Sequence, residues 1–420
     1  MKVCVIGSGG REHALAWRLS ISPSVTKVYA IPGSAAMSDC AELVGIDWQQ
    51  SDHLISFLKD NQVDLVVVGP EAPLVAGLAD VLNKVGIPVF GPSKAAAQLE
   101  GSKVFAKDLM KKYNIPTAAY GVFHKVDEAK AFIAQTGAPI VVKADGLAAG
   151  KGVVVAMTVE EANAAVEDML SGNRFGDAGS TVVIEEFMEG EEASLLAFVD
   201  GKTVVPMIAS QDHKRIFDGD KGPNTGGMGT YAPAPVLTDA LRDAAMKTIL
   251  EPMVAAMEKE GMPYVGCLYA GLMITDEGPK VVEFNARFGD PETQVVLPLL
   301  DSDLGEIMMA CAKGTLTSNM VKWKDSSAAC VILASKGYPE TSSKGDVISG
   351  DIKQYDTTIV FHSGTKLVGE NYVTNGGRVL GVVGLGKDLR TALDRAYERI
   401  EHIDFEGMQY RTDIGAKAFK

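Results

Sequence analysis

The first hundred residues alternate short apolar runs with amphipathic segments, and loops rich in glycine or proline follow the apolar runs. The apolar runs, which are typical of buried strands, span residues 3–6, 25–31, 64–68 and 88–90. Helical patterns lie between them, at residues 11–19 and 54–59. This alternation predicts βαβ units and a parallel, doubly wound sheet, in which ligands bind at the carboxyl ends of the strands.

The pattern changes near residue 103, where helices and strands begin to follow one another in a mixed order. The expected helices span 104–113 and 159–170, and the expected strands span 140–143, 153–157, 181–187 and 193–199. The last segment is richer in β pattern and closes with a helical stretch at 389–403. We therefore expect an α/β and α+β multidomain protein, with an N-terminal doubly wound domain at 1–102, a mixed domain at 103–327 and a β-rich domain at 328–420.

The length and charge narrow the class of protein. A chain of 420 residues is too long for one core of usual size, so two to four domains are expected. The formal net charge of -14 argues against a nucleic-acid or anionic-membrane surface, although local basic groups can still bind phosphates in a cleft. The five cysteines are scattered and show no metal-ligand spacing, and no apolar run is long enough to span a bilayer. We expect a soluble cytoplasmic protein, and we interpret its first residues as a strand and not as a signal peptide.

The segment from Val281 to Gln294 contains the residues that are most informative about function. Glu283, Asn285 and Arg287 alternate with apolar residues, so in a strand their side chains would share one face. Burying a carboxylate, an amide and a guanidinium together is costly unless something binds them. Carboxylate and amide oxygens suit Mg²⁺, and an arginine can clamp a phosphate or carboxylate. The structural alternative is a salt-bridged strand edge.

Two glycine-rich segments are candidate anion-binding sites. The turn Gly-Ser-Gly-Gly-Arg-Glu at 7–12 follows a strand and opens a helix, so backbone N–H groups can face an anion. Glu12 stands where a dinucleotide site needs a third glycine, and no acidic residue ends the second strand, so a NAD site is disfavoured. The segment 143–153 joins two strands by a loop of small residues bracketed by lysines, as a phosphate loop would. A tight turn and a bare β-hairpin are the alternatives.

Two further segments are ambiguous by themselves. The glutamate-rich stretch at 185–192 is either a solvated turn or an adenine-binding hinge, with Glu186 C=O and Met188 N–H exposed and Glu192 near ribose hydroxyls. The charged cluster at 210–215 precedes a glycine-rich loop at 222–229, which binds an anion or lies on the surface. His213 has no assignable serine or cysteine partner for nucleophilic catalysis.

Taken together and in this order, these segments resemble the ATP-grasp carboxylate–amine ligases, and within them the glycinamide ribonucleotide synthetases (phosphoribosylamine–glycine ligases). The matching motifs are Gly-Gly-Arg-Glu-His-Ala at 9–14, Gly-Pro-Glu-Ala-Pro-Leu at 69–74, the loop at 143–153, the segments 211–215 and 223–229, Asn-Ala-Arg-Phe-Gly-Asp-Pro-Glu-Thr-Gln at 285–294 and Thr-Asn-Gly-Gly-Arg-Val at 374–379. The resemblance covers the full length. No transformylase or cyclase segment follows residue 420, so we expect the monofunctional form.

The resemblance implies a ligase of de novo purine biosynthesis. It would join glycine to 5-phosphoribosylamine with ATP, through a glycyl phosphate, and give glycinamide ribonucleotide, ADP and phosphate. It further implies an ATP-grasp core with a mobile lid subdomain at about 123–192. The partners would be these small molecules alone, without nucleic acid or membrane. We expect a monomer with at most weak association with other purine-pathway enzymes.

The resemblance also assigns residues to the nucleotide and its metal. Glu283 and Asn285 would hold Mg²⁺ or Mn²⁺, and Arg287 would stabilise the transferring group. Many ATP-grasp enzymes carry another acidic ligand on the preceding strand, but residues 268–274 contain no carboxylate, which leaves the number of metal ions open. The expected ATP-binding residues are Lys103, Lys143, Gly150, Lys151, Gly152, Glu185, Glu186, Phe187, Met188 and Glu192.

The remaining implied residues concern the other substrates. Gly9, Gly10 and Arg11 would bind the sugar phosphate, Glu71 would take ribose hydroxyls, and Gly377 and Arg378 would close from the C-terminal domain. Asp212, Lys214 and Asp290 are candidates for glycine or amine contacts, and with Arg287 the last two are candidate catalytic residues.

Three competing hypotheses remain at this point. An ATP-grasp carboxylase subunit or another purine-pathway ligase would use bicarbonate or formate, and the Arg-Phe-Gly-Asp-Pro-Glu stretch argues against both. A regulatory nucleotide-binding protein would need no aligned Glu283, Asn285 and Arg287. A NAD-dependent oxidoreductase would need a third glycine at position 12 and an acidic residue at the end of the second strand, and the chain has neither.

Overall fold

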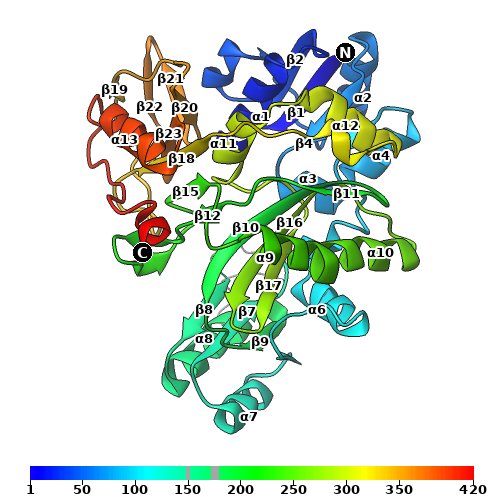
Figure 1. Ribbon diagram of the computed structural model, residues 1–420, viewed down its shortest axis with the longest axis vertical. Coiled ribbons are helices and arrows are strands. Elements are labelled where there is room, and N and C mark those ends of the chain that lie inside the picture. Colours follow the sequence, from blue (N-terminus) through cyan, green and yellow to red (C-terminus); the bar gives the residue numbers. More distant parts are fainter. Residues whose placement is uncertain (148–151, 172–178) are drawn as a thin grey trace.

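The computed structural model describes residues 1–147, 152–171 and 179–420. Figure 1 shows the N-terminal sheet and the C-terminal sheet side by side at one end, a central antiparallel sheet below them and a smaller sheet at the opposite end. The expected fold class, α/β and α+β in several domains, is confirmed.

The N-terminal domain is a parallel sheet in the order β3-β2-β1-β4-β5. Its strands are β1 (Lys2–Gly7), β2 (Lys27–Pro32), β3 (Glu42–Leu43), β4 (Leu65–Val68) and β5 (Val89–Phe90). Its helices are α1 (Gly10–Ser20), α2 (Ser51–Asp60), α3 (Glu71–Ala76) and α4 (Leu78–Lys84). The four expected strands and two expected helices are confirmed, although β2 begins at Lys27 instead of residue 25. All four residues of β4 are buried, which explains its unbroken apolar run.

Two antiparallel sheets form the middle of the chain. The first, in the order β11-β10-β16-β17, contains β10 (Glu191–Asp200), β11 (Val204–Pro206), β16 (Val265–Thr275) and β17 (Gly278–Asn285). The second, which we call the lid sheet, runs in the order β6-β9-β7-β8 with β6 (Tyr120–Phe123), β7 (Ile140–Ala144), β8 (Val153–Ala156) and β9 (Val182–Glu186). The helices of this region are α5 (Gln98–Gly101), α6 (Lys103–Lys112), α7 (Val126–Thr136), α8 (Val159–Ser171), α9 (Asp239–Ala245) and α10 (Glu251–Lys259), with a π-helical turn, Met246–Leu250, between the last two.

The C-terminal sheet has the order β12-β15-β18-β23-β20. Three of its strands come from the last hundred residues, namely β18 (Ser327–Ala334), β20 (Thr358–His362) and β23 (Arg378–Gly386). The other two, β12 (Gln211–Asp212) and β15 (Gly229–Ala232), come from the segment we expected in the middle domain. The chain therefore crosses between the middle and C-terminal regions at the charged cluster, which brings that cluster close to both.

Short elements complete the C-terminal half. They are β13 (Arg215–Phe217), β14 (Lys221–Asn224), α11 (Thr293–Val296), α12 (Leu304–Lys313), β19 (Ser349–Gly350), β21 (Thr365–Val368), β22 (Asn371–Thr374), α13 (Leu389–Ile400) and β24 (Ile403–Asp404). The last helix ends at Ile400, three residues before the expected end, because Ile403 and Asp404 pair with β19 instead.

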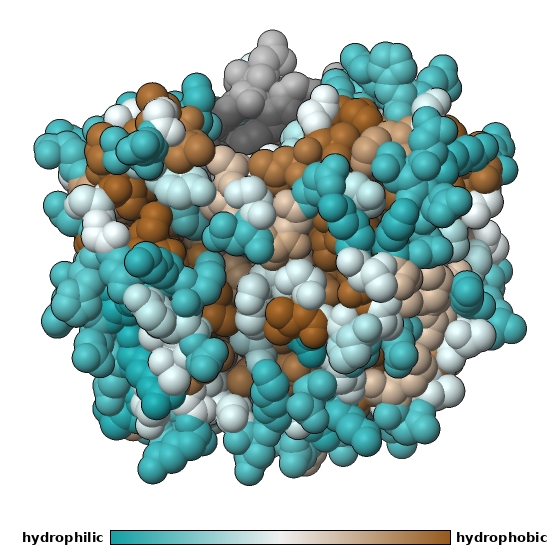
Figure 2. All heavy atoms as spheres, turned by 90° about the horizontal axis from the view of Figure 1, so that it is seen from above, coloured by the Kyte–Doolittle hydropathy of each residue, from teal (hydrophilic) through white to brown (hydrophobic). Residues whose placement is uncertain are grey.

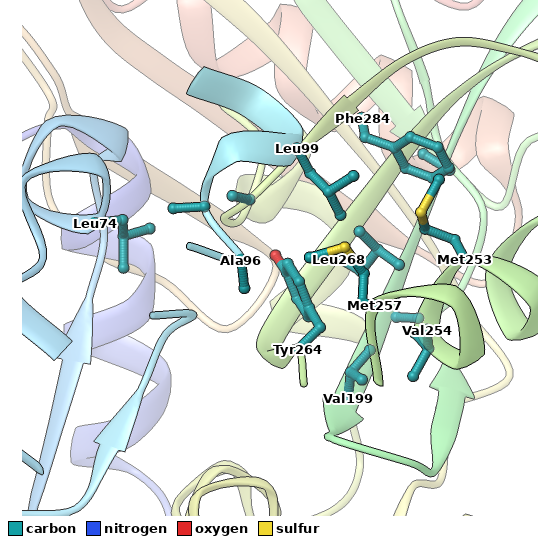
Figure 3. Close-up of a cluster of buried hydrophobic side chains, with 14 of the residues drawn as sticks. Leu74, Ala96, Leu99, Val199, Met253, Val254, Met257, Tyr264, Leu268 and Phe284 are labelled. Carbon is teal, nitrogen blue, oxygen red and sulfur yellow. The ribbon is translucent and has the colours of Figure 1, made fainter. Parts of the chain in front are cut away.

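The core shows which parts form one unit. Leu74 and Leu99, from the N-terminal part of the chain, belong to the same buried cluster as Leu268 and Phe284 of the central sheet (Figure 3). The lid sheet and helices α7 and α8 have a separate buried cluster of their own. The N-terminal domain and central sheet therefore share hydrophobic burial, whereas the lid region packs largely on itself.

The surface seen from above carries hydrophilic side chains around most of its periphery, with hydrophobic residues in separate patches between them (Figure 2). In the described parts of the chain, no helix is long and apolar enough to cross a membrane.

Close packing of α13 on β23 generates a stability prediction. A Cβ added to Gly384 would lie 2.0 Å from the Ala392 carbonyl oxygen and 2.7 Å from the Ala396 nitrogen. Because backbone atoms of a packed helix cannot move aside cheaply, Gly384→Ala should cost about 1–3 kcal/mol of unfolding free energy. Thermal melting would measure this loss. Gly45→Ala is the matched control, since nothing lies within 4 Å of its added Cβ; equal melting temperatures for the two variants would contradict the packing argument.

Candidate active site

A cavity of about 780 Å³ lies where the lid sheet, the central sheet and the C-terminal region meet. Most of the sequence-predicted site residues line it. They are Arg11, Lys103, Lys143, Gly152, Glu185, Glu186, Phe187, Met188, Glu192, Asp212, Lys214, Glu283, Asn285, Arg287, Asp290 and Arg378. Gly9, Gly10, Glu71 and Gly377 are not among the lining residues, and Gly150 and Lys151 lie outside the described residues.

Glu283 and Asn285 reach the cavity from the end of β17. Gly271 of β16 pairs with Glu283, but Leu272 pairs with Val281, so Val282 is an extra residue in the β17 ladder. The bulge precedes Glu283, and Glu283, Phe284 and Asn285 pair in unbroken register with Gly271, Ala270 and Tyr269, so Glu283 and Asn285 share one face as expected. Arg287 lies beyond the end of the strand, but it still lines the same cavity.

The electrostatic setting of Glu283 favours its charged form. Burial acts to raise its pKa, but the ammonium groups of Lys214, Lys143 and Lys103 together hold the pKa of this carboxyl below its ordinary value. The described residues supply no hydrogen bond or ion pair to its oxygens. An ionised carboxylate beside an amide oxygen is a donor set for a hard cation.

Two lysines share one buried carboxylate. Glu185 Oε2 of β9 lies 3.0 Å from Lys143 Nζ of β7 and 3.2 Å from Lys107 Nζ of α6, and all three side chains are nearly fully buried. Lys143 also donates to the Val282 carbonyl at 3.0 Å, which ties the lid sheet to β17. Burial lowers the pKa of Lys107 to about 8, against the opposing charge of Glu185. Our sequence reasoning missed Lys107, although it lies one helical turn after Lys103 on the same face of α6.

Lys103 begins α6 at a capped terminus. Ser102 accepts a hydrogen bond from the Phe105 amide, and Asp145 accepts one from the Val104 amide at 3.2 Å. The Lys103 ammonium donates to the Gly146 carbonyl at 3.0 Å, and burial lowers its pKa. These contacts bind the start of the small-residue loop to α6, the helix that carries Lys103 and Lys107.

Arg287 is held by two carboxylates. Its Nε lies 3.2 Å from Glu71 Oε2, and its Nη2 lies 2.7 Å from Glu100 Oε1. Burial disfavours the charge, but Glu100 and Glu71 keep the pKa of Arg287 above its ordinary value. Glu100 also accepts the Ala286 amide at 2.7 Å, so it fixes the backbone next to Arg287. Sequence reasoning missed Glu100, which is distant in the sequence and in no motif.

The amino end of α1 is occupied by carboxylates of the protein itself. Glu12 accepts the Gly9 amide at 2.8 Å and pairs with Arg11 Nε at 2.6 Å. Burial acts to raise the pKa of Asp290, but Arg378 and Arg11, with a hydrogen bond from the Arg11 backbone, hold it below its ordinary value. An anion placed here would therefore meet two negative charges beside the arginines.

The C-terminal motif closes around Asp290. Arg378 Nη1 donates to the Asp290 carbonyl and to the Gly226 carbonyl, both at 2.8 Å, and so connects β23 with the glycine-rich loop. Gly377 faces the ring of Tyr338 instead of the cavity, since an added Cβ would lie 2.1 Å from that ring.

The charged cluster places Asp212 beside Lys214. Burial raises the pKa of Asp212 to about 7, with the Lys214 charge opposing and the Glu292 and Glu192 carboxylates adding to the shift. The Asp212 carboxylate in turn raises the pKa of Lys214 well above its ordinary value. Lys214 Nζ also lies 3.6 Å from Glu192 Oε2, at the start of β10.

Chemically, the cavity joins two kinds of surface. One side presents buried lysines and a carboxylate–amide pair, which suit a polyphosphate with a divalent cation. The other side presents Asp212, Lys214, Asp290 and Arg378, which suit small charged substrates.

Models of the phosphoribosylglycinamide synthetase family match the N domain at residues 1–100, the ATP-grasp (A) domain at 101–293 and the C domain at 328–417. A phosphoribosylamine–glycine ligase of Halalkalibacterium halodurans is 54% identical over 418 residues, covering 100% of this chain and 97% of that protein. One of Neisseria meningitidis is 53% identical and covers 100% of this chain and 99% of that protein.

Solved structures agree with these matches. The crystal structure of phosphoribosylamine–glycine ligase from Thermotoga maritima superposes with a TM-score of 0.87 at 34% identity, over 99% of this chain and 100% of that one. A biotin carboxylase from Campylobacter jejuni shares the fold, with a TM-score of 0.74 at 15% identity over 97% of this chain and 92% of that one.

The shared carboxylate generates a prediction. Glu185→Gln would leave two buried ammonium groups without their counterion, so we expect a loss of about 3–5 kcal/mol in unfolding free energy. Adding Lys107→Met should recover part of it. Denaturant unfolding of the Glu185→Gln single variant and of the Glu185→Gln, Lys107→Met double variant would measure the loss and its partial recovery. Glu167→Gln is the control, because its exposed pair with Lys130 joins α7 and α8 of the same region and should contribute less than about 1 kcal/mol; equal losses in Glu185→Gln and Glu167→Gln would contradict the counterion role.

Proposed function

Because the chain belongs to the phosphoribosylglycinamide synthetase family, we infer that it ligates glycine to 5-phosphoribosylamine with ATP, giving glycinamide ribonucleotide, ADP and phosphate. It is an ATP-grasp ligase of purine biosynthesis. The observation that supports this reaction best is that Lys103, Lys143, Glu283 and Asn285 line the same cavity as Asp212 and Lys214.

The chemistry begins with an unreactive carboxylate. A carboxylate is a poor acyl donor, so the γ-phosphoryl group of ATP passes first to a glycine carboxylate oxygen and forms glycyl phosphate. The neutral amine of phosphoribosylamine then attacks the carbonyl carbon, and phosphate leaves with that oxygen as the nitrogen loses a proton. The protein contributes position and charge. Lys103 and Lys143 neutralise the triphosphate, together with Lys151, while Arg287 and Lys214 stabilise the transferring group and Asp290 contacts the attacking amine.

The donor set fits Mg²⁺ or Mn²⁺ completed by the substrate. No group of three or more histidine, cysteine or acidic side chains that could hold a metal occurs among the described residues. Mg²⁺ is commonly held by one or two carboxylates together with substrate phosphates and water, so Glu283 and Asn285 are sufficient protein ligands. The bound cation would neutralise charge on the β- and γ-phosphates.

The nucleotide lies against the lid. In this proposal Gly150 and Gly152 approach the phosphates, Glu185 orients Lys143, and Glu186, Phe187 and Met188 border the adenine. Glu192 contacts the ribose. We propose that the lid region, about 123–192, closes over the nucleotide, and the separate buried cluster between Phe123 and Ile184 supports movement of that described part as a unit.

The sugar phosphate occupies the other end of the cavity. Arg11 and Arg378 supply positive charge there, and Gly377 supports the turn that carries Arg378. Gly9, Gly10 and Glu71 lie outside the cavity lining, so the proposed approach of Gly9 and Gly10 to the sugar phosphate and of Glu71 to ribose hydroxyls requires the ligand to displace the contacts of Glu12 with Gly9 and of Arg287 with Glu71. Asp212 contacts glycine. We place the domain boundaries at 1–102, 103–327 and 328–420, and we propose a cytoplasmic monomer that associates at most weakly with other enzymes of the pathway.

The test of the reaction is ADP release with ATP, Mg²⁺ and glycine, with and without phosphoribosylamine made in situ from ribose 5-phosphate and ammonia. We expect release only when glycine and the amine are both present. Release driven equally by bicarbonate or formate would overturn the substrate assignment.

Loss of the metal anchor should strongly lower turnover. Glu283→Ala removes the only carboxylate of the proposed metal site, so ATP turnover should fall on the order of 10²-fold or more. Asp276→Ala, on the exposed turn between β16 and β17, should keep wild-type turnover. Wild-type turnover in Glu283→Ala would refute the metal assignment.

Loss of the sugar-phosphate contact should be selective. Arg378→Ala should raise the KM for phosphoribosylamine on the order of tenfold or more, because a charge-assisted contact to phosphate is lost. The KM for ATP should remain nearly unchanged, and exposed Arg390→Ala should alter neither. A similar rise in both KM values for Arg378→Ala would show that the residue only supports the loop at 226–227.

A further inference from the structure

Arg411 is a buried arginine that the assignments above leave without a role. It is 1% exposed, and it lies outside the helices and strands in residues 411–417, which we call the anchor segment. Its Nε and Nη2 donate to the two carboxylate oxygens of Asp413 at 2.7 and 2.8 Å, and its Nη1 lies 2.9 Å from Asp220 Oδ1. The same Nη1 donates to the Arg215 carbonyl at 3.1 Å. One guanidinium therefore joins the anchor segment to the hairpin formed by β13 and β14.

Further contacts hold this hairpin against the anchor segment. Asp218, in the turn of the hairpin, accepts hydrogen bonds from the Thr412 amide at 2.8 Å and from the hydroxyl of the same residue. Lys417 Nζ lies 2.7 Å from Asp220 Oδ2, and both of these residues line the cavity. The anchor segment thus fixes a hairpin that forms part of the cavity wall.

The hairpin in turn holds the backbone of Lys214. The Thr225 amide and hydroxyl both donate to the Lys214 carbonyl, at 2.7 and 2.8 Å. Arg215, whose carbonyl accepts from Arg411, is the next residue in the chain. The side chain of Lys214 is held less firmly, because its ion pair with Glu192 is 3.6 Å long, beyond the length of a good hydrogen bond. The position of the Lys214 ammonium in the cavity therefore depends on the backbone that the hairpin fixes.

The anchor segment also reaches His213, the residue before Lys214. The Gly415 amide donates to His213 Nε2 at 3.5 Å, and His213 Nδ1 lies 3.2 Å from the Gly229 carbonyl oxygen. Nδ1 must therefore carry the proton of a neutral ring. Burial is the main cause that lowers the pKa of His213 to about 4, so the ring stays neutral near pH 7. Both neighbours of Lys214 in the chain are thus held by the anchor segment.

We propose that Arg411 is a positioning residue for the ligase reaction and acts through Lys214. By tying the hairpin to the anchor segment, it keeps the Lys214 ammonium where the phosphoryl group passes to the glycine carboxylate. Arg411 is not among the described residues that line the cavity, so its effect on the reaction is indirect. The inference rests on the proposed function, in which Lys214 stabilises the transferring group.

The test is a double-mutant cycle that combines Arg411→Gln with Lys214→Met. ADP release gives kcat, and circular dichroism gives the folded fraction by which kcat is divided. We expect Arg411→Gln to lower kcat on the order of tenfold and Lys214→Met to lower it on the order of 10²-fold. Because both losses act at the same ammonium, Arg411→Gln should lower kcat by less than about twofold further when Lys214 is already absent.

Arg399→Gln is the matched control. Arg399 is also a buried arginine of the C-terminal region, but its Nη atoms donate to Asp351 at 2.6 Å and to the Lys353 carbonyl at 2.8 Å instead of to the hairpin. Its loss should lower the melting temperature, as the loss of Arg411 should. It should change kcat per folded enzyme by less than about twofold, with or without Lys214.

Wild-type kcat in Arg411→Gln, or an equal effect of Arg411→Gln with and without Lys214, would overturn the proposal. If Arg411→Gln fails to fold, Arg411→Lys replaces it, because an ammonium keeps the buried charge but loses the forked donors; kcat should then fall by about threefold or more, again only when Lys214 is present. Wild-type ADP release that depends on glycine and phosphoribosylamine, measured in parallel, reports on the proposed function alone, so the two failures are distinguishable.

Discussion

The ion pairs of Glu185 with Lys107 and Lys143 hold together the region where the lid meets the central sheet. They bring α6, β7 and β9 to one point, and Lys143 extends the contact to the Val282 carbonyl of β17. Ion pairs of this kind must be complete, because an uncompensated buried charge costs several kcal/mol. The same requirement explains why Arg287 lies between Glu71 and Glu100. The cavity is thus built by pairing charges from segments far apart in the sequence.

The pairing is incomplete at functionally important positions. The charges of three lysines lower the pKa of Glu283, but none of these lysines contacts it in the described structure. The hydrogen-bond donors to the Glu292 carboxylate in the described structure are the hydroxyls of Tyr269 and Ser194. Both carboxylates line the cavity with Tyr269, and Glu283 is the proposed metal ligand. A buried carboxylate without a cation from the protein can bind a cation of the ligand. The fold has already held that carboxylate in position, so less free energy is spent on ordering it when the ligand binds.

Much of the fold could be predicted from the sequence, because hydrophobic periodicity is local. The apolar runs of β1 and β4 and the helical pattern of α6 needed no knowledge of distant residues. The C-terminal sheet could not be predicted as fully, since β12 and β15 join it through long-range pairing. The bulge at Val282 also escaped, because alternation along one strand does not reveal its register with β16.

The site residues also fall into those that the sequence predicted and those that only the structure revealed. Motif residues such as Glu283, Asn285 and Lys143 line the cavity as expected from the resemblance. Lys107, Glu100 and Glu292 were missed as contributors, because their importance arises from partners more than seventy residues away in the sequence or from burial. Buried charge balance is a property of the folded arrangement, and a single sequence does not display it.

We propose that this cavity activates the glycine carboxylate by phosphoryl transfer before the amine attacks. Glycine labelled with ¹⁸O in both carboxylate oxygens tests it directly, with mass spectrometry of the phosphate released during turnover. We expect one ¹⁸O atom in each phosphate, because the phosphate leaves with the acyl oxygen. Phosphate without the label would contradict it, since the glycine carboxylate would then never have been phosphorylated.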